Sequence, residues 1–295
     1  MDHKVVVVTG ASSSLGRLSA QALALAGHTV YASMRDTRGR NALHVEAVSS
    51  FADDNGVDLR TVEMDLQSQA EVNIAIQRVF DANGRIDAVV HSAGRAVFGP
   101  VEAVKPEQML ALFDVNVIGP QRVSRAALTH MRQQKQGLLV WISASSSPGG
   151  TPPGLAAYVA SSAALDVLAV GYAHEVARWG VETVIIAPGT FTLSQCGRAE
   201  SPADPAVTDQ YETGSPAGPG SRRCQAFDAT ELLDSDVYAV ADAIVNVVDC
   251  PLGRRPFRAR INHAAPSLVV GEMFEQRSYP GRRATHTGYW GSSTQ

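Results

Sequence analysis

The chain has 295 residues, of which 45% are hydrophobic, and a formal net charge of −4 at pH 7. A chain of this length can bury a large core as one α/β domain. The negative net charge and the absence of lysine and arginine runs argue against a nucleic-acid-binding protein. Cys196, Cys224 and Cys250 are widely spaced with no Cys-x-x-Cys pair, so we expect free thiols and neither disulfides nor a metal site.

No apolar run approaches the about 18 residues of a membrane span, and the N-terminus enters an apolar strand without signal-peptide features. We therefore expect a cytoplasmic protein that does not associate with membranes.

The first element is a run of four valines after Lys4, which predicts a fully buried parallel strand. A Gly/Ser-rich turn follows, and Arg17–Ala26 has apolar residues at helical spacing. Backbone N–H groups and the helix dipole converge at such a turn, which favours binding of a pyrophosphate. Gly10 permits the turn and Gly16 permits close helix packing, whereas Ser14 stands where a third glycine would be expected. An ordinary strand–helix turn of an unrelated α/β protein is the alternative.

Strand-like and helix-like segments then alternate along the chain. The expected strands are His28–Ser33, Val57–Met64, Ile86–His91, Leu138–Ser143, Val181–Ala187 and Pro256–Ile261. The expected helices are Arg40–Asn55, Gln69–Asn83, Lys105–Leu112, Val115–Arg132, Ala156–Trp179 and Asp234–Val248. This alternation predicts an α/β fold, a doubly wound parallel sheet (Rossmann-like) with helices on both faces, in a single domain.

The alternation stops at Pro188-Gly189. From Thr190 to Thr230 several prolines occur among glycines and serines with little periodicity, which predicts a loop without structure of its own that is either functional or disordered. The Gly-, Arg- and Ser-rich end, Ser278–Gln295, predicts a loosely held tail. We expect one domain over residues 1–261, a substrate loop or lid at about 190–230, and a C-terminal extension over 262–295.

Several short motifs occur in the order that is typical of one family. Thr9-Gly10-x-x-x-Ser14-x-Gly16 precedes the first helix, His91-Ser92-Ala93-Gly94 ends a strand, and Pro188-Gly189 ends a later one. Ser145 and Tyr158 are thirteen residues apart. From Lys4 to Ile261 the sequence resembles the short-chain dehydrogenase/reductase family. The run from Ala93 to Glu102 is similar to the branch that contains 17β-hydroxysteroid and retinol dehydrogenases.

The resemblance implies roles for individual residues. The catalytic residues would be Ser145, Tyr158 and Asn116, the last within Phe113-Asp-Val-Asn116. The cofactor would contact Gly10, Ser12, Ser14, Leu15, Gly16, Arg17, Arg35, Asp65, Leu66, Ser92, Ala93, Gly94, Pro188, Gly189 and Phe191. An apolar substrate pocket would be lined by Val97, Phe98, Gly149, Leu155 and Phe191.

Carbonyl reduction requires a hydride donor, a proton donor and a hydrogen-bond donor to the carbonyl oxygen. Tyr158 can give the proton and Ser145 can hold the oxygen, although Tyr158 could equally be a packed helix-start aromatic. Asn116 is more readily explained as a structural polar contact inside a helix. Asp65 either contacts the adenine ring, as the resemblance implies, or caps the helix that begins near Ser68.

One departure from the family pattern concerns the lysine that holds the nicotinamide ribose and lowers the pKa of the tyrosine. The family has Tyr-x-x-x-Lys, whereas this chain has Tyr158-Val-Ala-Ser-Ser162. Arg95 could restore part of the missing positive charge, and His91 could relay a proton, although both could be structural.

The end of the second predicted strand bears on cofactor choice. A dinucleotide fold selects NAD with an acidic residue there and NADP with a nearby arginine. Ser33 stands at the acidic position, and Arg35 and Arg17 can face a 2′-phosphate. We therefore expect NADP, with surface arginines and NAD binding through Asp36 as the alternative.

These observations predict an NADP-dependent oxidoreductase acting on a carbonyl or hydroxyl of a medium-sized apolar small molecule. A non-redox enzyme (dehydratase, cyclase or isomerase) or a non-catalytic binding subunit is the alternative. A homodimer or homotetramer is expected, because family members commonly dimerise through Val115–Arg132 and Ala156–Trp179. The second helix carries small residues that allow close approach: Ala160, Ser161, Ala164, Gly171 and Ala173. The alternative is that these small faces pack on the chain's own sheet.

Overall fold

The computed structural model describes residues 2–143, 154–188, 199–213, 233–261 and 269–270. In this part of the chain the strands form one sheet in the order β3-β2-β1-β4-β5-β6-β7-β8. Their bounds are β1 Val5–Val8, β2 Thr29–Met34, β3 Leu59–Glu63, β4 Ala88–His91, β5 Gly137–Ile142, β6 Val181–Pro188, β7 Arg258–Ile261 and β8 Val269–Val270. Neighbouring strands from β3 to β7 pair in parallel, as predicted, and the short β8 pairs antiparallel with β7.

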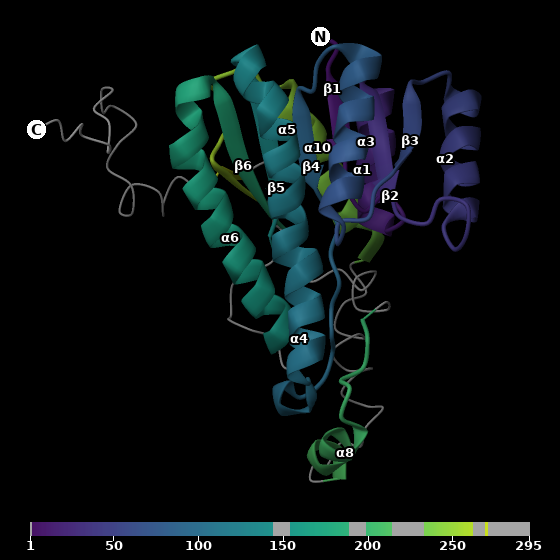
Figure 1. Ribbon diagram of the computed structural model, residues 1–295, viewed down its shortest axis with the longest axis vertical. Helices are drawn as coiled ribbons and strands as arrows, with labels where there is room; N and C mark the ends of the chain where they lie inside the picture. Colours follow the sequence, from purple (N-terminus) through teal and green to yellow (C-terminus); the bar gives the residue numbers. More distant parts are fainter. Residues whose placement is uncertain (1, 144–153, 189–198, 214–232, 262–268, 271–295) are drawn as a thin grey trace, which may run out of the picture.

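Helices cover both faces of the sheet (Figure 1). On one face lie α1 Ser14–Leu25, α2 Ala42–Asn55 and α10 Leu233–Asp249. On the other face lie α3 Gln69–Asn83, α5 Gly119–Gln134 and α6 Ala156–Val176, which the short η3 Ala177–Trp179 follows. The doubly wound α/β architecture is therefore confirmed.

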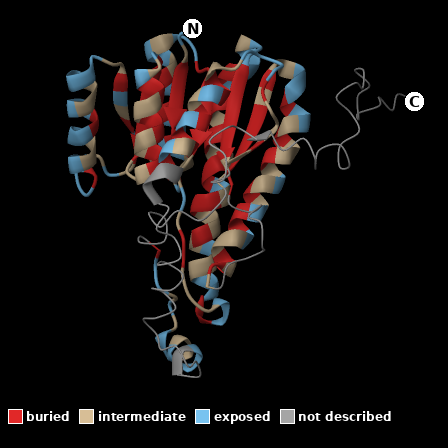
Figure 2. Cartoon of the chain, turned by 180° about the vertical axis from the view of Figure 1, so that it is seen from behind, coloured by how far each residue is buried: buried red, intermediate tan, exposed pale blue. Residues whose placement is uncertain are grey.

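Strand β1 explains why its sequence is uniformly apolar. Val6 and Val8 belong to the core beneath α1 and α10, whereas Val5 and Val7 belong to the core beneath α3, α5 and α6. Successive side chains of a strand point to opposite faces, so a central strand with two covered faces needs apolar residues at every position. Figure 2 shows the strands as the buried centre of the molecule.

The segment Ala156–Trp179, which comprises α6 and η3, is long and apolar enough to cross a membrane, with a mean hydropathy of 1.4 in its most apolar window. In this fold it connects β5 to β6. It buries Leu165, Ala169 and Val176 in the core of the second face. One face of α6 thus belongs to the core, and 28% of its most apolar window is buried.

Helix α1 begins three residues before the predicted start at Arg17, because Ser13 caps it. The Ser13 hydroxyl accepts a hydrogen bond from the Gly16 N–H at 3.1 Å and donates one to the Gly10 carbonyl at 2.8 Å. Part of the Gly/Ser-rich turn is thus the first turn of the helix.

The prediction that residues 190–230 form a loop without structure of their own is wrong for part of that range. Helix α8 spans Pro205–Thr213. Asp204 precedes it and accepts hydrogen bonds from the N–H groups of Val207 and Thr208, through its carboxylate and its carbonyl oxygen respectively. Proline is well suited to the first helical position, so Pro205, which suggested a loop, starts a helix instead.

Residues 199–204 pair with the segment that follows β4. Phe98 N–H donates to the Glu200 carbonyl at 3.0 Å, and Glu200 N–H donates to the Ala96 carbonyl at 2.9 Å. The Tyr211 hydroxyl of α8 donates to the Glu102 carboxylate at 2.6 Å. These contacts join α8 to η1 Val101–Ala103, next to α4 Pro106–Phe113. In Figure 1 this assembly extends below the sheet.

Candidate active site

The described site residues gather at the carboxyl edge of the parallel strands, where α/β sheets bind ligands. They follow β1, β2, β3 and β4, end β6, or lie at the start of α6: Gly10, Ser12, Ser14, Leu15, Gly16, Arg17, Arg35, Asp65, Leu66, Ser92, Ala93, Gly94, Pro188, Leu155 and Tyr158. Ser145, Gly149, Gly189 and Phe191 lie outside the described residues.

Two glycines make the turn after β1 possible. Gly10 has a φ of +73°, and a Cβ there would lie 2.6 Å from Cα of Ala93. A Cβ on Gly16 would overlap the carbonyl oxygen of Gly10. Both positions therefore require glycine, as the sequence predicts, and the turn is pressed against the loop after β4.

The first turn of α1 offers hydrogen-bond donors to a ligand. Ser13 satisfies the N–H of Gly16, whereas the N–H groups of Ser14 and Leu15 have no acceptor among the described residues. The Ser92 hydroxyl is buried, also without a partner in the described part of the chain. First-turn amides and the helix dipole favour an anion, so these groups fit the phosphates of a dinucleotide.

Thr9 is a structural part of this site that the sequence analysis did not single out. Its hydroxyl accepts hydrogen bonds from the N–H groups of Ser92 at 3.1 Å and Ala93 at 3.2 Å, and donates to the Val90 carbonyl at 3.3 Å. Thr9 therefore ties the ends of β1 and β4 together. A buried polar residue directly after four valines was the signal for it.

The ends of β2 and β3 meet through a glutamine. Arg35 Nη1 donates to Gln67 Oε1 at 3.5 Å, and Gln67 N–H donates to the Asp65 carboxylate at 2.9 Å. The cap of α3 is Ser68, which accepts from the Glu71 N–H at 3.3 Å, and not Asp65.

The Asp36 carboxylate accepts the Arg40 N–H at 2.9 Å and lies against Gly39 of its own turn. Ser33, at the position expected to be acidic for NAD binding, is buried and belongs to β2.

Asn116 lies in a π-helical turn, η2 Asp114–Ile118, between α4 and α5. Its Oδ1 accepts the Arg95 N–H at 2.8 Å, and its Nδ2 donates to the Arg95 carbonyl and to Ser161 Oγ, both at 2.9 Å. The Ser161 hydroxyl donates to the carbonyl of Tyr158 at 2.7 Å. The predicted site residues Asn116 and Tyr158 are thus connected through Ser161. The sequence offered this serine either for close approach of a partner helix or for packing on the chain's own sheet.

Tyr158 lies in the first turn of α6. Ser162, at the lysine position of the family pattern, is 5% exposed, and its carbonyl accepts a hydrogen bond from Ser143 Oγ at 3.3 Å. The buried residue one turn after Tyr158 on the same side of α6 is therefore uncharged.

Arg95 and His91 have partners that define their roles. The Arg95 guanidinium forms an ion pair with Glu200, which offsets its positive charge. His91 is fully buried, its Nε2 lies 3.0 Å from Ser124 Oγ, and its ring lies 4.3 Å from that of Trp141. Burial lowers the pKa of His91 to about 3, so the imidazole is neutral near pH 7 and is a structural group.

The predicted substrate residues surround the start of α6. The Phe98 ring lies against Gly154, and Gly99 N–H donates to the Gly154 carbonyl at 2.9 Å. Val97 and Leu155 are nearly fully buried, and Val97 packs with Val104, Leu112 and Ala157 in a small core of its own.

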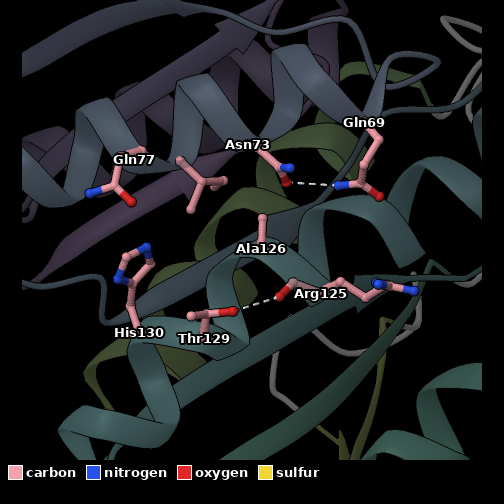
Figure 3. Close-up of a pocket in the computed structure, with 8 residues that line it drawn as sticks. Gln69, Asn73, Gln77, Arg125, Ala126, Thr129 and His130 are labelled. Carbon is pink, nitrogen blue, oxygen red and sulfur yellow. Dashed lines mark hydrogen bonds between the residues drawn. The ribbon is translucent and has the colours of Figure 1, made fainter.

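A groove of about 340 Å³ lies elsewhere, between α3 and α5. Figure 3 shows Gln77 and His130 at one end and Gln69 and Arg125 at the other. The His130 ring stacks on Phe80 with centroids 4.0 Å apart. None of the predicted site residues lines this groove, so we do not assign the chemistry to it.

Comparisons with known proteins show the family of this chain. A family model described as short chain dehydrogenase matches residues 4–204, which is more than half of the chain. The chain belongs to the short-chain dehydrogenase family. This membership supports an oxidoreductase.

Individual relatives are only moderately similar. Estradiol 17-beta-dehydrogenase 1 of Rattus norvegicus is 34% identical over 194 residues, which cover 64% of this chain but only 54% of that protein. A solved short-chain dehydrogenase from Streptomyces avermitilis has a TM-score of 0.67 and 28% identity, covering 88% of this chain and 90% of that one. A gluconate 5-dehydrogenase from Burkholderia cenocepacia, solved with NADP and tartrate, has a TM-score of 0.64 and 25% identity, covering 83% and 88%.

Proposed function

We propose that this protein is an NADP-dependent oxidoreductase that interconverts a carbonyl and a hydroxyl on a medium-sized, largely apolar small molecule. We call the turn at Gly10 with the N–H groups of Ser14 and Leu15 the cofactor cradle. The supporting observation is a continuous set of contacts from this cradle to Tyr158. Gly10 packs on Ala93, and the loop after β4 continues to Arg95, which Asn116 joins to the first turn of α6. The turn at Gly10 and Tyr158 are thus connected along one edge of the sheet.

The proposed chemistry assigns one task to each group. A bound nicotinamide supplies or accepts the hydride. The Tyr158 hydroxyl gives the proton to the forming alkoxide in reduction and accepts it in oxidation. Ser145 donates a hydrogen bond to the carbonyl oxygen of the substrate. Phe98 and Leu155 at the start of α6 favour an apolar substrate.

NADP rather than NAD is supported by the charged side chains after β2 and in the first part of α1. Arg35 and Arg17 are cationic, whereas the Asp36 carboxylate is engaged within its own turn and Ser33 is buried. The Burkholderia neighbour was solved with NADP. Arg35→Ala is expected to weaken NADPH binding about 10-fold and to leave NADH binding unchanged, with the exposed Arg38→Ala as the control, measured by calorimetry. Tighter binding of NADH than of NADPH by the wild type would contradict NADP use.

The uncharged Ser162 favours a second candidate, a non-redox enzyme of the same fold or a non-catalytic binding subunit. Thermal-shift measurements with NADPH, with NADH and without nucleotide show whether the protein binds a nicotinamide nucleotide. Consumption of NADPH with a panel of apolar ketones distinguishes a redox enzyme from the other two candidates. Binding of nucleotide without turnover would favour the non-catalytic subunit.

We also propose a homodimer or homotetramer in the cytoplasm. Apolar side chains are exposed on α4, η2 and α6, at Leu110 (70%), Ile118 (44%) and Val167 (70%). A Cβ on Gly171 of α6 would meet open space. Ser161, by contrast, is buried within its own chain and cannot belong to such an interface. Light scattering that gives a strict monomer at micromolar concentration would refute the assembly.

A further inference from the structure

Helix α6 carries Tyr158 in its first turn, but among the described residues no side chain caps its start. The capping position is Leu155, which makes no side-chain hydrogen bond to the helix. The first N–H groups of a helix have no intrahelical acceptor, so an uncapped first turn is held weakly by local interactions alone. Something other than a cap must hold the peptide of Tyr158 in place if the phenol is to reach a substrate in one orientation.

The hydrogen-bond chain from Asn116 supplies this restraint, and its donor directions are fixed by chemistry. A backbone N–H can only donate and a carbonyl can only accept, so the contacts with Arg95 fix which end of the Asn116 amide is Nδ2. Because Nδ2 only donates, Ser161 Oγ accepts from it, and the hydroxyl proton is left for the Tyr158 carbonyl at 2.7 Å. The donor and the acceptor of every hydrogen bond in this hydrogen-bond chain are therefore determined.

The chain is also shielded from water. Asn116 is 5% exposed and Ser161 is fully buried. Water therefore cannot replace the hydroxyl of Ser161 without a rearrangement of α6 against η2. Loss of this hydroxyl would leave Nδ2 of Asn116 as a buried donor without an acceptor, which is unfavourable. The restraint crosses 45 positions of sequence and connects three elements: the loop after β4, the π-helical turn and α6.

We propose that Ser161 is a positioning residue for Tyr158. Held by Nδ2 of Asn116, its hydroxyl fixes the peptide of Tyr158 and thereby the direction of the phenol. This inference rests on the proposed function. It makes Ser161 a contributor to turnover that does not touch substrate or cofactor.

The test uses Ser161→Ala and a matched control, Ser124→Ala. Ser124 is also fully buried, and its hydroxyl also makes a side-chain hydrogen bond, to His91, whereas in the described part of the chain it shares no hydrogen bond with Arg95, Asn116 or Ser161. Activity is followed as NADPH oxidation with 9,10-phenanthrenequinone, a flat apolar dicarbonyl, as the probe. Independently of activity, hydrogen exchange measures the opening of the first turn of α6.

We expect Ser161→Ala to lower kcat between about 10-fold and 100-fold, with KM for NADPH changed less than twofold, and to accelerate exchange at residues 156–161. Ser124→Ala should lower the melting temperature without either effect. Asn116→Ala should also lower kcat, and the double variant Asn116→Ala/Ser161→Ala should be no slower than Asn116→Ala alone, since both changes break one chain.

An unchanged kcat in Ser161→Ala, in a wild type that oxidises NADPH, overturns the positioning role and leaves the proposed function intact. The positioning role is also overturned if the fold-losses of kcat in Asn116→Ala and in Ser161→Ala multiply in the double variant, because the two residues would then act independently. A wild type that oxidises no NADPH with the probe defeats the proposed function and the positioning role together. Unchanged exchange at the start of α6 in Ser161→Ala shows that the hydroxyl does not restrain this turn.

Discussion

Of the helices that begin at the carboxyl edge of the sheet, α1 and α6 are held in opposite ways. Helix α1 is capped by Ser13, whose hydroxyl bonds both the Gly10 carbonyl and the Gly16 N–H three residues away. Helix α6 has no side-chain cap, and its first turn is restrained from Asn116, 45 positions away. The start of α1 is therefore fixed by its own turn, whereas the position of Tyr158 depends on contacts between distant segments.

This difference predicts how each half of the site responds to change. A local turn forms wherever its own few residues are intact, so nucleotide binding should tolerate changes around α6. The orientation of Tyr158 requires β4, η2 and α6 to be packed together, so turnover should be the more sensitive of the two properties. Four variants test this comparison, beginning with the largest expected effect.

Tyr158→Phe should remove turnover while leaving the α1 side intact. A positioned general acid contributes about 10²- to 10⁴-fold, so we expect kcat/KM to fall by about 10³-fold. Binding of NADPH, measured by calorimetry, should stay within twofold of the wild type. A Tyr158→Phe variant that keeps ordinary turnover would show that another group moves the proton.

Ser162→Lys should change the pH dependence on the α6 side only. A free tyrosine has a pKa of about 10, and an ammonium about 5 Å away at an effective dielectric of about 20 is worth about 3 kcal/mol, or roughly two pKa units. The wild type lacks this charge, so we expect slow turnover with a bias toward reduction and an oxidative rate that still rises at alkaline pH.

In Ser162→Lys the oxidative rate should level off at a pH about two units lower, measured with NADP and an apolar alcohol in both directions. An oxidative profile that does not move, in an enzyme whose wild type already turns over NADP(H) at an ordinary rate, would refute this account. Absence of nicotinamide turnover in both proteins would favour the non-redox candidates.

The comparison of the two helix starts also explains what could be predicted from the sequence. The valine run, the requirement for Gly10 and Gly16, and α3 at Gln69–Asn83 depend on residues close in sequence, and the structure has them as expected. The cap at Ser13 was missed because the serines of the turn are chemically alike, and only geometry selects one of them.

Nonlocal features were the ones that could not be predicted. Pro205 was interpreted as a loop residue because Thr190–Thr230 has several prolines among glycines and serines with little periodicity. Asp204 and the contacts with Ala103 and Glu102 nevertheless stabilise α8 there. The sequence left open whether Ser161 faces a partner helix or the chain's own sheet, because small residues lie on several faces of Ala156–Trp179. The group that donates a hydrogen bond to the Ser161 hydroxyl is Nδ2 of Asn116, which lies in η2. The spacing of residues along α6 does not reveal it.

His91 lies between the two helix starts, because β4 separates β1 from β5 in the sheet. Its pKa is about 3 in the folded chain because of burial, against about 6.5 when unfolded. Between these values the unfolded chain binds a proton that the folded chain does not, so folding stability rises with pH in this window and is lost as pH falls below about 6.5.

From pH 7.5 to 5.0 the His91 contribution amounts to about 2 kcal/mol of lost stability. We expect His91→Asn to reduce the difference between urea unfolding at pH 7.5 and at pH 5.0 by this amount. An equal pH dependence of His91→Asn and the wild type would show that His91 is not the responsible group.

The smallest expected effect comes from the cap of α1, and it has a matched control within the chain. Ser13→Ala removes the acceptor for Gly16 N–H and the bond to the Gly10 carbonyl, whereas Ser68→Ala removes the cap of α3, which accepts the Glu71 N–H at 3.3 Å. Each change should cost about 1 kcal/mol of unfolding free energy, measured in urea. Only Ser13→Ala should also weaken NADPH binding. The Ser13 hydroxyl fixes the turn at Gly10, and the Ser14 and Leu15 N–H groups that we expect to bind the phosphates follow directly after this turn. Equal NADPH affinity in the two variants would mean that Gly10 and Ala93 alone shape the cradle, and that the local restraint on α1 serves stability rather than binding.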